Sequence, residues 1–236
     1  MSRCWIQVFE KMEIEGGIAL IASQGLRSAG WLAINFLIEK IKPSLIAKIF
    51  STSFPIQHET IPTYNAQPDA RGVGGVFVDS GLATEPSVEV YRAGGDLMIV
   101  RGYQANFYGQ RETAEKTVEL LEQLGASLII GLAAHATGKG DLCIAATKPE
   151  LVEHYSRTLK AEAYQGPLLG FTGLTLGEAA IRDIDAICIL TKTTTNDEFP
   201  EQPDYEAAKK LVRAIISLLK LEIDPFDLEN FNSKLT

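Results

Sequence analysis

Residues 17–50 read GIALIASQGLRSAGWLAINFLIEKIKPSLIAKIF, and this stretch decides the fold class. Residues 17–22 form a short, unbroken apolar run, which is typical of a buried strand. Apolar side chains then recur at helical spacing up to Ile41, with Ser28 placed to cap the helix and Pro43 placed to end it. A second apolar run follows at residues 45–50. Strand, helix and strand in this order predict a right-handed parallel crossover, the unit of an α/β fold.

The middle of the chain predicts a polar surface excursion followed by antiparallel strands. Residues 51–75 are rich in Ser, Thr, Gln and Asn and contain three prolines, so regular elements are not expected there. Residues 76–79, 88–92 and 97–101 are short β-like runs. The last two are separated by Ala-Gly-Gly-Asp, which predicts a hairpin.

Helical and strand-like patterns alternate again in the second half of the chain. Ala114, Val118 and Leu121 share one helical face, and Gly125 follows where a left-handed C-cap belongs. The other predicted elements are strands at residues 127–131, 142–146 and 185–190 and helices at residues 149–157, 174–182 and 204–221. One α/β domain over residues 1–236 follows, with a C-terminal tail at residues 222–236.

The predicted helix at residues 204–221 is strongly amphipathic. One face carries apolar side chains and the opposite face carries charged ones, so we expect it to pack on the sheet. Glu206 is placed to pair with Lys210 four residues later. The helix between Ser28 and Ile41 is apolar over more than half its circumference. We expect it to lie between the sheet and a neighbouring helix, with contact to another subunit as the alternative.

The composition excludes several classes of protein. The formal net charge is −8 and the pI is near 5.0, which disfavours nucleic-acid binding because phosphates are neutralised by Lys and Arg. Polar residues interrupt the apolar stretch at residues 18–38, so no membrane span is expected. The N-terminal region lacks the apolar core of an export signal, and the three cysteines are far apart in sequence. We expect a cytoplasmic protein.

The glycine-rich stretch GLAAHATGKGD at residues 131–141 invites comparison with a phosphate-binding loop. Ala133 occupies the first glycine position, and Gly140 follows Lys139 where Ser or Thr would bind magnesium. A strand-like run, rather than a helix, comes next. The stretch is therefore interpreted as a connection between strands, and no cofactor is expected.

Polar side chains at strand ends are the candidates for a ligand pocket. Loops at the carboxyl ends of α/β strands are where ligands usually bind. The candidates are Gln104, His135, Lys139 and Thr191. The alternative is ordinary turn chemistry, in which these side chains hydrogen-bond to nearby backbone. Neither a nucleophile with a base nor a metal-ligand spacing accompanies them, so we predict no catalytic and no metal-binding residue.

The stretches PLLGFTGLTLGEAAIRDIDAICILTKT at residues 167–193 and PDYEAAKKLVRAIISLLKLEIDPFDL at residues 203–228 share a recognisable order of features. A glycine-rich turn and a helix of small residues precede a strand with a Thr-bearing loop, then a Pro-Asp helix start and an Ile-Asp turn. In this order the chain resembles the proteasome assembly chaperone 2 family. The positions that carry the resemblance are Gly173, Leu174, Gly177, Glu178, Ala179, Asp185, Thr191, Thr193, Pro203, Asp204, Ala207, Ala208, Ile223 and Asp224. Weaker similarity covers residues 17–30, 96–105 and 127–138.

This resemblance implies a three-layer α/β/α sandwich with a mixed sheet, similar to that of nucleoside phosphorylases. It also implies a homo- or hetero-oligomer that binds proteasome α-subunits, or a paralogous chaperone subunit, without catalysis. The resemblance also implies a docking tail. Family members that dock on the α-ring use a C-terminal tail in which a hydrophobic residue is followed by Tyr and then by any residue. Here Lys234, Leu235 and Thr236 stand at those positions, so the tyrosine is replaced by leucine.

Three hypotheses about function follow. The first is a chaperone-like binding protein of the proteasome. The second is a small-molecule hydrolase or a phosphorylase-like enzyme that uses the strand-end loops. The third is a structural partner whose apolar face is covered in a homo-oligomer.

Overall fold

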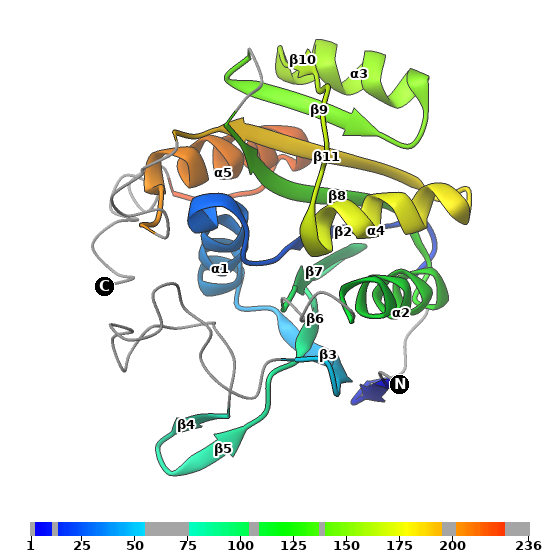
Figure 1. Ribbon diagram of the computed structural model, residues 1–236, viewed down its shortest axis with the longest axis vertical. Helices are drawn as coiled ribbons and strands as arrows, with labels where there is room; N and C mark the ends of the chain where they lie inside the picture. The colour runs from blue at the N-terminus through cyan, green and yellow to red at the C-terminus, as the bar shows by residue number, and fades with distance from the viewer. Residues whose placement is uncertain are drawn as a thin grey trace.

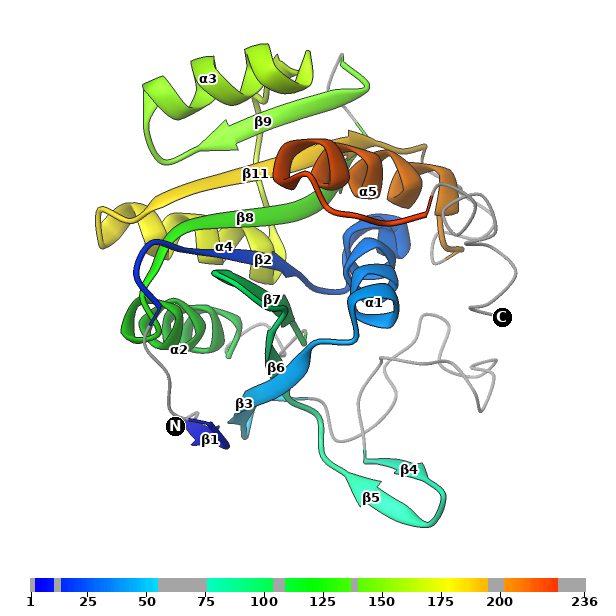
Figure 2. The same ribbon diagram turned by 180° about the vertical axis from the view of Figure 1, so that it is seen from behind.

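The computed structural model describes residues 3–10, 14–54, 76–103, 109–136, 140–194 and 202–224. They form a nine-stranded mixed sheet between two layers of helices, as Figures 1 and 2 show from opposite sides. The helical segments are η1 Leu26–Ser28, α1 Ala29–Ile41, α2 Gln110–Gln123, α3 Pro149–Leu159, α4 Gly170–Ile181 and α5 Tyr205–Leu219. The fold is therefore the predicted α/β/α sandwich.

The large sheet has the order β1-β3-β6-β7-β2-β8-β11-β9-β10. Its strands are β1 Cys4–Val8, β2 Gly17–Ala22, β3 Ser44–Ser51, β6 Val88–Arg92, β7 Leu97–Arg101, β8 Ala126–His135, β9 Leu142–Ala146, β10 Glu162–Ala163 and β11 Asp185–Lys192. The four central strands β7, β2, β8 and β11 are all parallel, so their carboxyl ends meet at one edge of the sheet. A second sheet contains β4 Phe77–Asp79 and β5 Leu82–Thr84 and projects from the body as a hairpin (Figure 1).

Apolar side chains fill both interfaces between the sheet and the helices. Alternate residues of the central strands point to opposite faces, as the two-residue period of a strand requires. On one face, Ile21, Val100 and Ile129 pack under α2 and α4. On the other, Leu20 and Ile130 pack under α1 and α5, which also pack against each other. The two interfaces make the sheet the shared core of both layers.

The strand–helix–strand unit at the start of the chain is confirmed with one correction. Strands β2 and β3 run parallel in the same sheet, but β7 and β6 lie between them. The predicted cap at Ser28 is wrong. This residue has a left-handed backbone with φ of 53° and makes no capping hydrogen bond, because η1 turns the chain immediately before α1.

Other differences arise where tertiary contacts override local patterns. Strand β1 was not expected, and α4 begins at Gly170, four residues before the predicted start. Glu206 pairs with Lys209 at 3.0 Å rather than with Lys210, whose ammonium group lies 3.4 Å from Asp141. The start of α5 agrees with the prediction. Asp204 caps it by accepting a hydrogen bond from the backbone N–H of Ala207.

The α1 helix is buried between the sheet and α5, which confirms the first of the two predicted environments. Most of the polar excursion, at residues 55–75, lies outside the described residues. None of the described helices is both long and apolar enough to cross a lipid bilayer.

Candidate functional site

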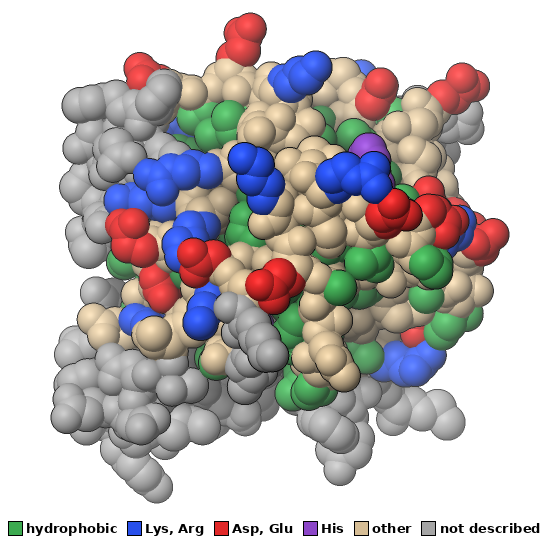
Figure 3. Space-filling model, turned by 90° about the horizontal axis from the view of Figure 1, so that it is seen from above, with side chains coloured by type: hydrophobic (Ala, Val, Ile, Leu, Met, Phe, Trp, Pro, Cys, Tyr) green, Lys and Arg blue, Asp and Glu red, His purple; other side chains and the backbone are tan. Residues whose placement is uncertain are grey.

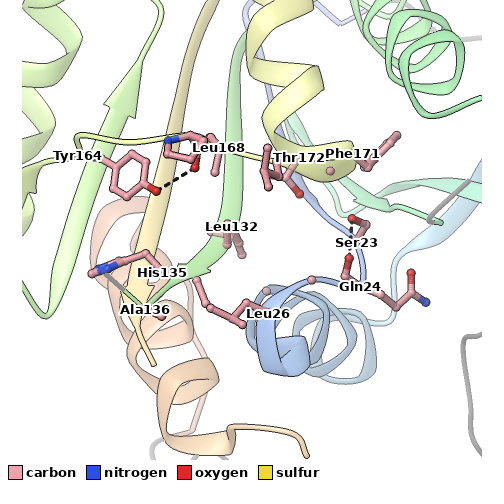
Figure 4. Close-up of a pocket in the computed structure, with 17 residues that line it drawn as sticks. Ser23, Gln24, Leu26, Leu132, His135, Ala136, Tyr164, Leu168, Phe171 and Thr172 are labelled. Atoms are coloured by element: carbon pink, nitrogen blue, oxygen red, sulfur yellow. Dashed lines mark hydrogen bonds between the residues drawn. The ribbon is translucent and has the colours of Figure 1, made fainter. Parts of the chain in front are cut away.

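A pocket of about 360 Å³ opens at the carboxyl edge of the central strands. We call it the edge pocket. Figure 4 shows it between the end of β8, the turn that follows β2 and the start of α4. Its lining residues are Ser23, Gln24, Gly25, Leu26, Gly30, Leu132, Ala133, Ala134, His135, Ala136, Tyr164, Pro167, Leu168, Leu169, Gly170, Phe171 and Thr172. None of them carries a carboxylate, an ammonium or a guanidinium group.

The start of α4 forms one wall of the edge pocket. Gly170 has φ of 74°, a left-handed backbone that glycine adopts without strain, and it turns the chain into the helix. Leu169 precedes it at the N-cap and has no side-chain oxygen with which to cap the helix. Phe171 anchors the turn, because its ring is buried and lies against Gly102, where a Cβ would come within 2.6 Å of it. The backbone N–H groups of the first turn of α4 therefore lie at the pocket wall.

His135 forms the opposite wall together with Tyr164. Only 3% of His135 is exposed, and its ring centroid lies 5.9 Å from that of Tyr164. Burial lowers the pKa of His135, and the nearby charge of Lys192 acts in the same direction, while a hydrogen bond with the backbone of Gly140 opposes them. The hydroxyl of Tyr164 donates to the carbonyl oxygen of Pro167 at 3.0 Å. The lowered pKa favours the neutral imidazole of His135, and the side chain of Tyr164 lies beside it.

The turn at residues 25–28 contributes Gly25 and Leu26 to the pocket lining and contains two strained residues. Arg27 and Ser28 both have left-handed backbones, with φ of 46° and 53°, which cost about 1–2 kcal/mol each in residues other than glycine. Contacts of Arg27 hold the turn in place. Its Nε donates to the carbonyl oxygen of Gln202 at 2.9 Å, and its Nη1 donates to the hydroxyl of Thr194 at 2.9 Å. The guanidinium group also lies 3.5 Å from a carboxylate oxygen of Asp204.

Little in the described residues equips this pocket for covalent chemistry. The two buried cysteines lie elsewhere, and burial raises the pKa of both thiols, that of Cys188 to about 12, so neither is a ready nucleophile. Within the described part of the chain, no group of three His, Cys, Asp or Glu side chains is arranged to hold a metal ion. Hydrogen bonding and apolar contact are what this arrangement provides.

The sequence pattern of the PAC2 family matches residues 22–235. This chain belongs to the PAC2 family. The match includes the whole edge pocket and all the central strands except most of β2.

Solved structures share the fold of this PAC2 family chain. It is similar to an archaeal proteasome activator, PbaB of Pyrococcus furiosus, with a TM-score of 0.78 and 24% identity over 99% of this chain and 96% of that one. PbaA of the same organism, an archaeal homologue of proteasome-assembly chaperone, has a TM-score of 0.75 and 19% identity over 98% of this chain and 92% of that one. A PAC2 family protein from Streptomyces avermitilis has a TM-score of 0.63 and 19% identity over 92% of this chain and 90% of that one.

The predicted pocket residues of this PAC2 family chain do not all come together. His135 lines the edge pocket. Thr191 is fully buried and pairs with Ala134, which packs on the helix layer of α1 and α5, whereas His135 points to the other face. Thr191 therefore lies in the core beside the pocket rather than in it. Gln104 and Lys139 lie outside the described residues, as do the tail residues Lys234, Leu235 and Thr236.

Sequence reasoning missed most of the pocket wall. Ser23, Gln24 and Leu26 follow the predicted strand at residues 17–22. The expectation that ligands bind at the carboxyl ends of strands, which selected His135, therefore also applies to them. Tyr164 and Thr172 carried no comparable signal. Their positions depend on the path of residues 164–170 across the sheet edge, which only the tertiary structure shows.

Proposed function

We propose that this chain is a non-catalytic, proteasome-assembly-chaperone-like protein that binds proteasome α-subunits or a paralogous chaperone subunit. Membership of the PAC2 family is the observation that carries this proposal. The similarity in fold to an archaeal homologue of proteasome-assembly chaperone supports it. We place this activity in the cytoplasm.

The exposed surface is compatible with a protein partner. On the face shown in Figure 3, Lys and Arg side chains lie among Asp and Glu rather than in a patch of their own. Charged side chains also pair across elements, as Lys148 does with Asp183 at 3.1 Å and with Asp185 at 2.7 Å. That mixed surface, together with the net charge of −8, disfavours nucleic acid as the partner.

Co-purification with tagged proteasome α-subunits tests the proposal. The full chain should be retained by the α-subunits, alone or together with a paralogue from the same source. Absence of retention in both settings would contradict the proposed function.

Substitutions in the tail should produce a variant that binds the proteasome α-subunits more tightly. The double substitution Lys234→Leu and Leu235→Tyr introduces the tail pattern of ring-docking family members, in which a hydrophobic residue is followed by Tyr and then by any residue. If the chain meets the α-ring through its tail, the double variant should be retained at least about tenfold more tightly, equivalent to about 1.4 kcal/mol. The matched control exchanges Ser233 for Leu and leaves the following three residues unchanged.

A small-molecule enzyme is the second candidate, and the edge pocket is the observation that favours it. A thermal-shift panel of nucleosides, nucleotides and phosphate tests this candidate, because a specific ligand raises the melting temperature by mass action. An enzyme of this class should be stabilised by at least one of them. No stabilisation by any member would remove the support for it.

A further inference from the structure

We propose that the edge pocket binds a small amphipathic anion. Its carboxylate or phosphate group would lie at the first turn of α4, and its apolar chain would lie against the leucine and phenylalanine side chains of the pocket. This inference does not depend on the proteasome as partner.

The edge pocket lies where the connections of two adjacent strands diverge. From β2 the chain continues through α1 to β3, on the β7 side of the sheet. From β8 it continues to β9, on the β11 side. The adjacent strands β2 and β8 thus send their connections in opposite directions, which opens a crevice between their carboxyl ends. Open α/β sheets bind their ligands at such switch points.

The first turn of α4 supplies the site for the anionic group. Its N–H groups lie at the positive end of a 12-residue helix, and the side chain of the N-cap residue Leu169 offers them no acceptor. Among the α-helices of the described residues, only α5 has a side-chain cap, which is Asp204. A carboxylate or phosphate in the edge pocket would accept these hydrogen bonds in place of a capping side chain.

Thr172 is an independent observation at the same place. Only 7% of it is exposed, it lines the pocket, and its hydroxyl makes no hydrogen bond with any residue in the described part of the chain. Its methyl group faces the sheet at Gly131, where a Cβ would lie 2.8 Å away. A hydroxyl at the wall of a cavity pairs with water or with a ligand that enters the cavity. Figure 4 shows it at the α4 wall beside Phe171.

The charges around the pocket agree with an anionic ligand. The described residues that line it include no carboxylate that would repel one. Lys192 lies close enough to His135 to influence its pKa, so a cation stands beside the pocket. This local arrangement differs from the net charge of the whole chain, which is −8.

The rest of the pocket requires an apolar body. Leu26, Leu132, Leu168 and Phe171 line it, and its volume of about 360 Å³ is at the lower end of the range of small-molecule sites. An inorganic anion alone would leave these side chains uncovered. A short alkyl chain of about six carbons fits within this volume and can lie against the apolar lining.

Titration of the ¹⁵N-labelled full chain, followed by NMR, tests the proposal with four probes: hexanoate, hexyl phosphate, hexanamide and inorganic phosphate. Hexanoate or hexyl phosphate should give saturable shifts at the amides of Gly170, Phe171 and Thr172. Hexanamide, which has the same chain without the charge, should bind at least about tenfold more weakly. The tighter of the two anions identifies the head group.

Two variants locate the binding. Thr172→Val keeps the shape and the packing on Gly131 but removes the hydroxyl, so the dissociation constant for the preferred anion should rise about three- to tenfold. Ala133→Leu fills the pocket and should abolish binding. Thr158→Val, on α3 and away from the pocket, is the matched control and should bind like the wild type.

Three results would overturn the proposal, and each is measured on the wild-type chain. The first is the absence of saturable shifts at α4 with both amphipathic anions. The second is equal affinity for hexanoate and hexanamide, which would remove the role of the anionic group. The third is equal affinity for phosphate and hexyl phosphate, which would remove the role of the apolar wall.

Discussion

Glu89 is the centre of a charge network at the residue scale. Its carboxylate accepts hydrogen bonds from Tyr91 at 2.7 Å and from Nε of Arg101 at 2.7 Å, and it lies 3.3 Å from the ammonium group of Lys48. Burial by itself would raise the pKa of Glu89, but Arg101, Tyr91 and Lys48 together lower it below its usual value. The network thus stabilises the folded state above the usual pKa of Glu89, and this stabilisation is lost as the pH falls.

We predict that Glu89→Gln lowers the free energy of unfolding by about 2 kcal/mol at neutral pH, because it leaves two partly buried cations without their carboxylate. Urea denaturation measures the difference. Glu153→Gln is the control. It breaks an exposed pair with Arg157 in α3 and should cost less than about 0.5 kcal/mol. Equal losses in the two variants would contradict the importance of the network.

His135 predicts a second loss of stability as the pH falls, and this one arises from the protonation of a buried imidazole. Its pKa is lowered in the folded protein, so between that pKa and about 6.5 the unfolded chain binds more protons than the folded one. The free energy of unfolding should therefore rise with pH across this window, with a slope of at most about 1.4 kcal/mol per pH unit from this residue. Above the window the contribution is fully present.

The His135→Asn variant should lose that slope, which urea unfolding at a series of pH values from about 4.5 to 7.5 would reveal as a difference from the wild type. The same substitution at His154, an exposed residue of α3, removes an imidazole that is not buried and serves as the comparison. A wild-type slope that survives in His135→Asn would assign the pH dependence to other groups.

At the scale of single elements, two helical glycines have opposite roles. Gly30 lies where α1 crosses β8, and a Cβ there would come within 2.2 Å of the carbonyl oxygen of Leu132. Gly177 lies within α4, and a Cβ there would meet nothing within 4 Å. The first glycine permits close packing of a helix on the sheet, whereas the second only weakens its helix.

Gly30→Ala should therefore lower the free energy of unfolding by more than about 2 kcal/mol, because backbone must move away from backbone. Gly177→Ala should raise it by about 0.5–1 kcal/mol, because alanine restricts the unfolded chain and favours the helix. Thermal and urea unfolding of the two variants make a matched test. A stabilised Gly30→Ala would show that α1 is packed less closely than the structure indicates.

The elements also show how far the sequence predicts the fold. Strands β2 and β9 have their predicted bounds, because each is an unbroken apolar run between turn residues. Strand β1 was not predicted from the sequence. Among the described residues, CWIQV pairs only with β3 at the edge of the sheet, and none of its side chains is completely buried. In the edge pocket, His135 followed from its place at a strand end, whereas Thr172 follows from where α4 lies across the sheet.

At the scale of the whole molecule, the two edges of the large sheet differ. Strand β10 has two residues, and so short an edge offers little for another strand to pair with. Strand β1 is longer and exposes large apolar side chains at its end of the sheet. Trp5 is 48% exposed and stacks on Phe50 with ring centroids 5.6 Å apart, and the neighbouring Phe9 is 50% exposed. Such an edge favours association with another chain.

We therefore expect a homo-oligomer that uses the β1 edge, with native mass spectrometry and light scattering as the measurements. The double variant Trp5→Gln and Phe9→Gln should raise the dissociation constant of the subunits at least about tenfold, because it removes the exposed apolar area that association would bury. Leu82→Gln, on the β4–β5 hairpin, removes a 73% exposed leucine elsewhere and should leave the assembly intact. A strictly monomeric wild type would contradict the oligomer. An oligomer that responds to Leu82→Gln instead of the β1 variant would move the interface to the hairpin.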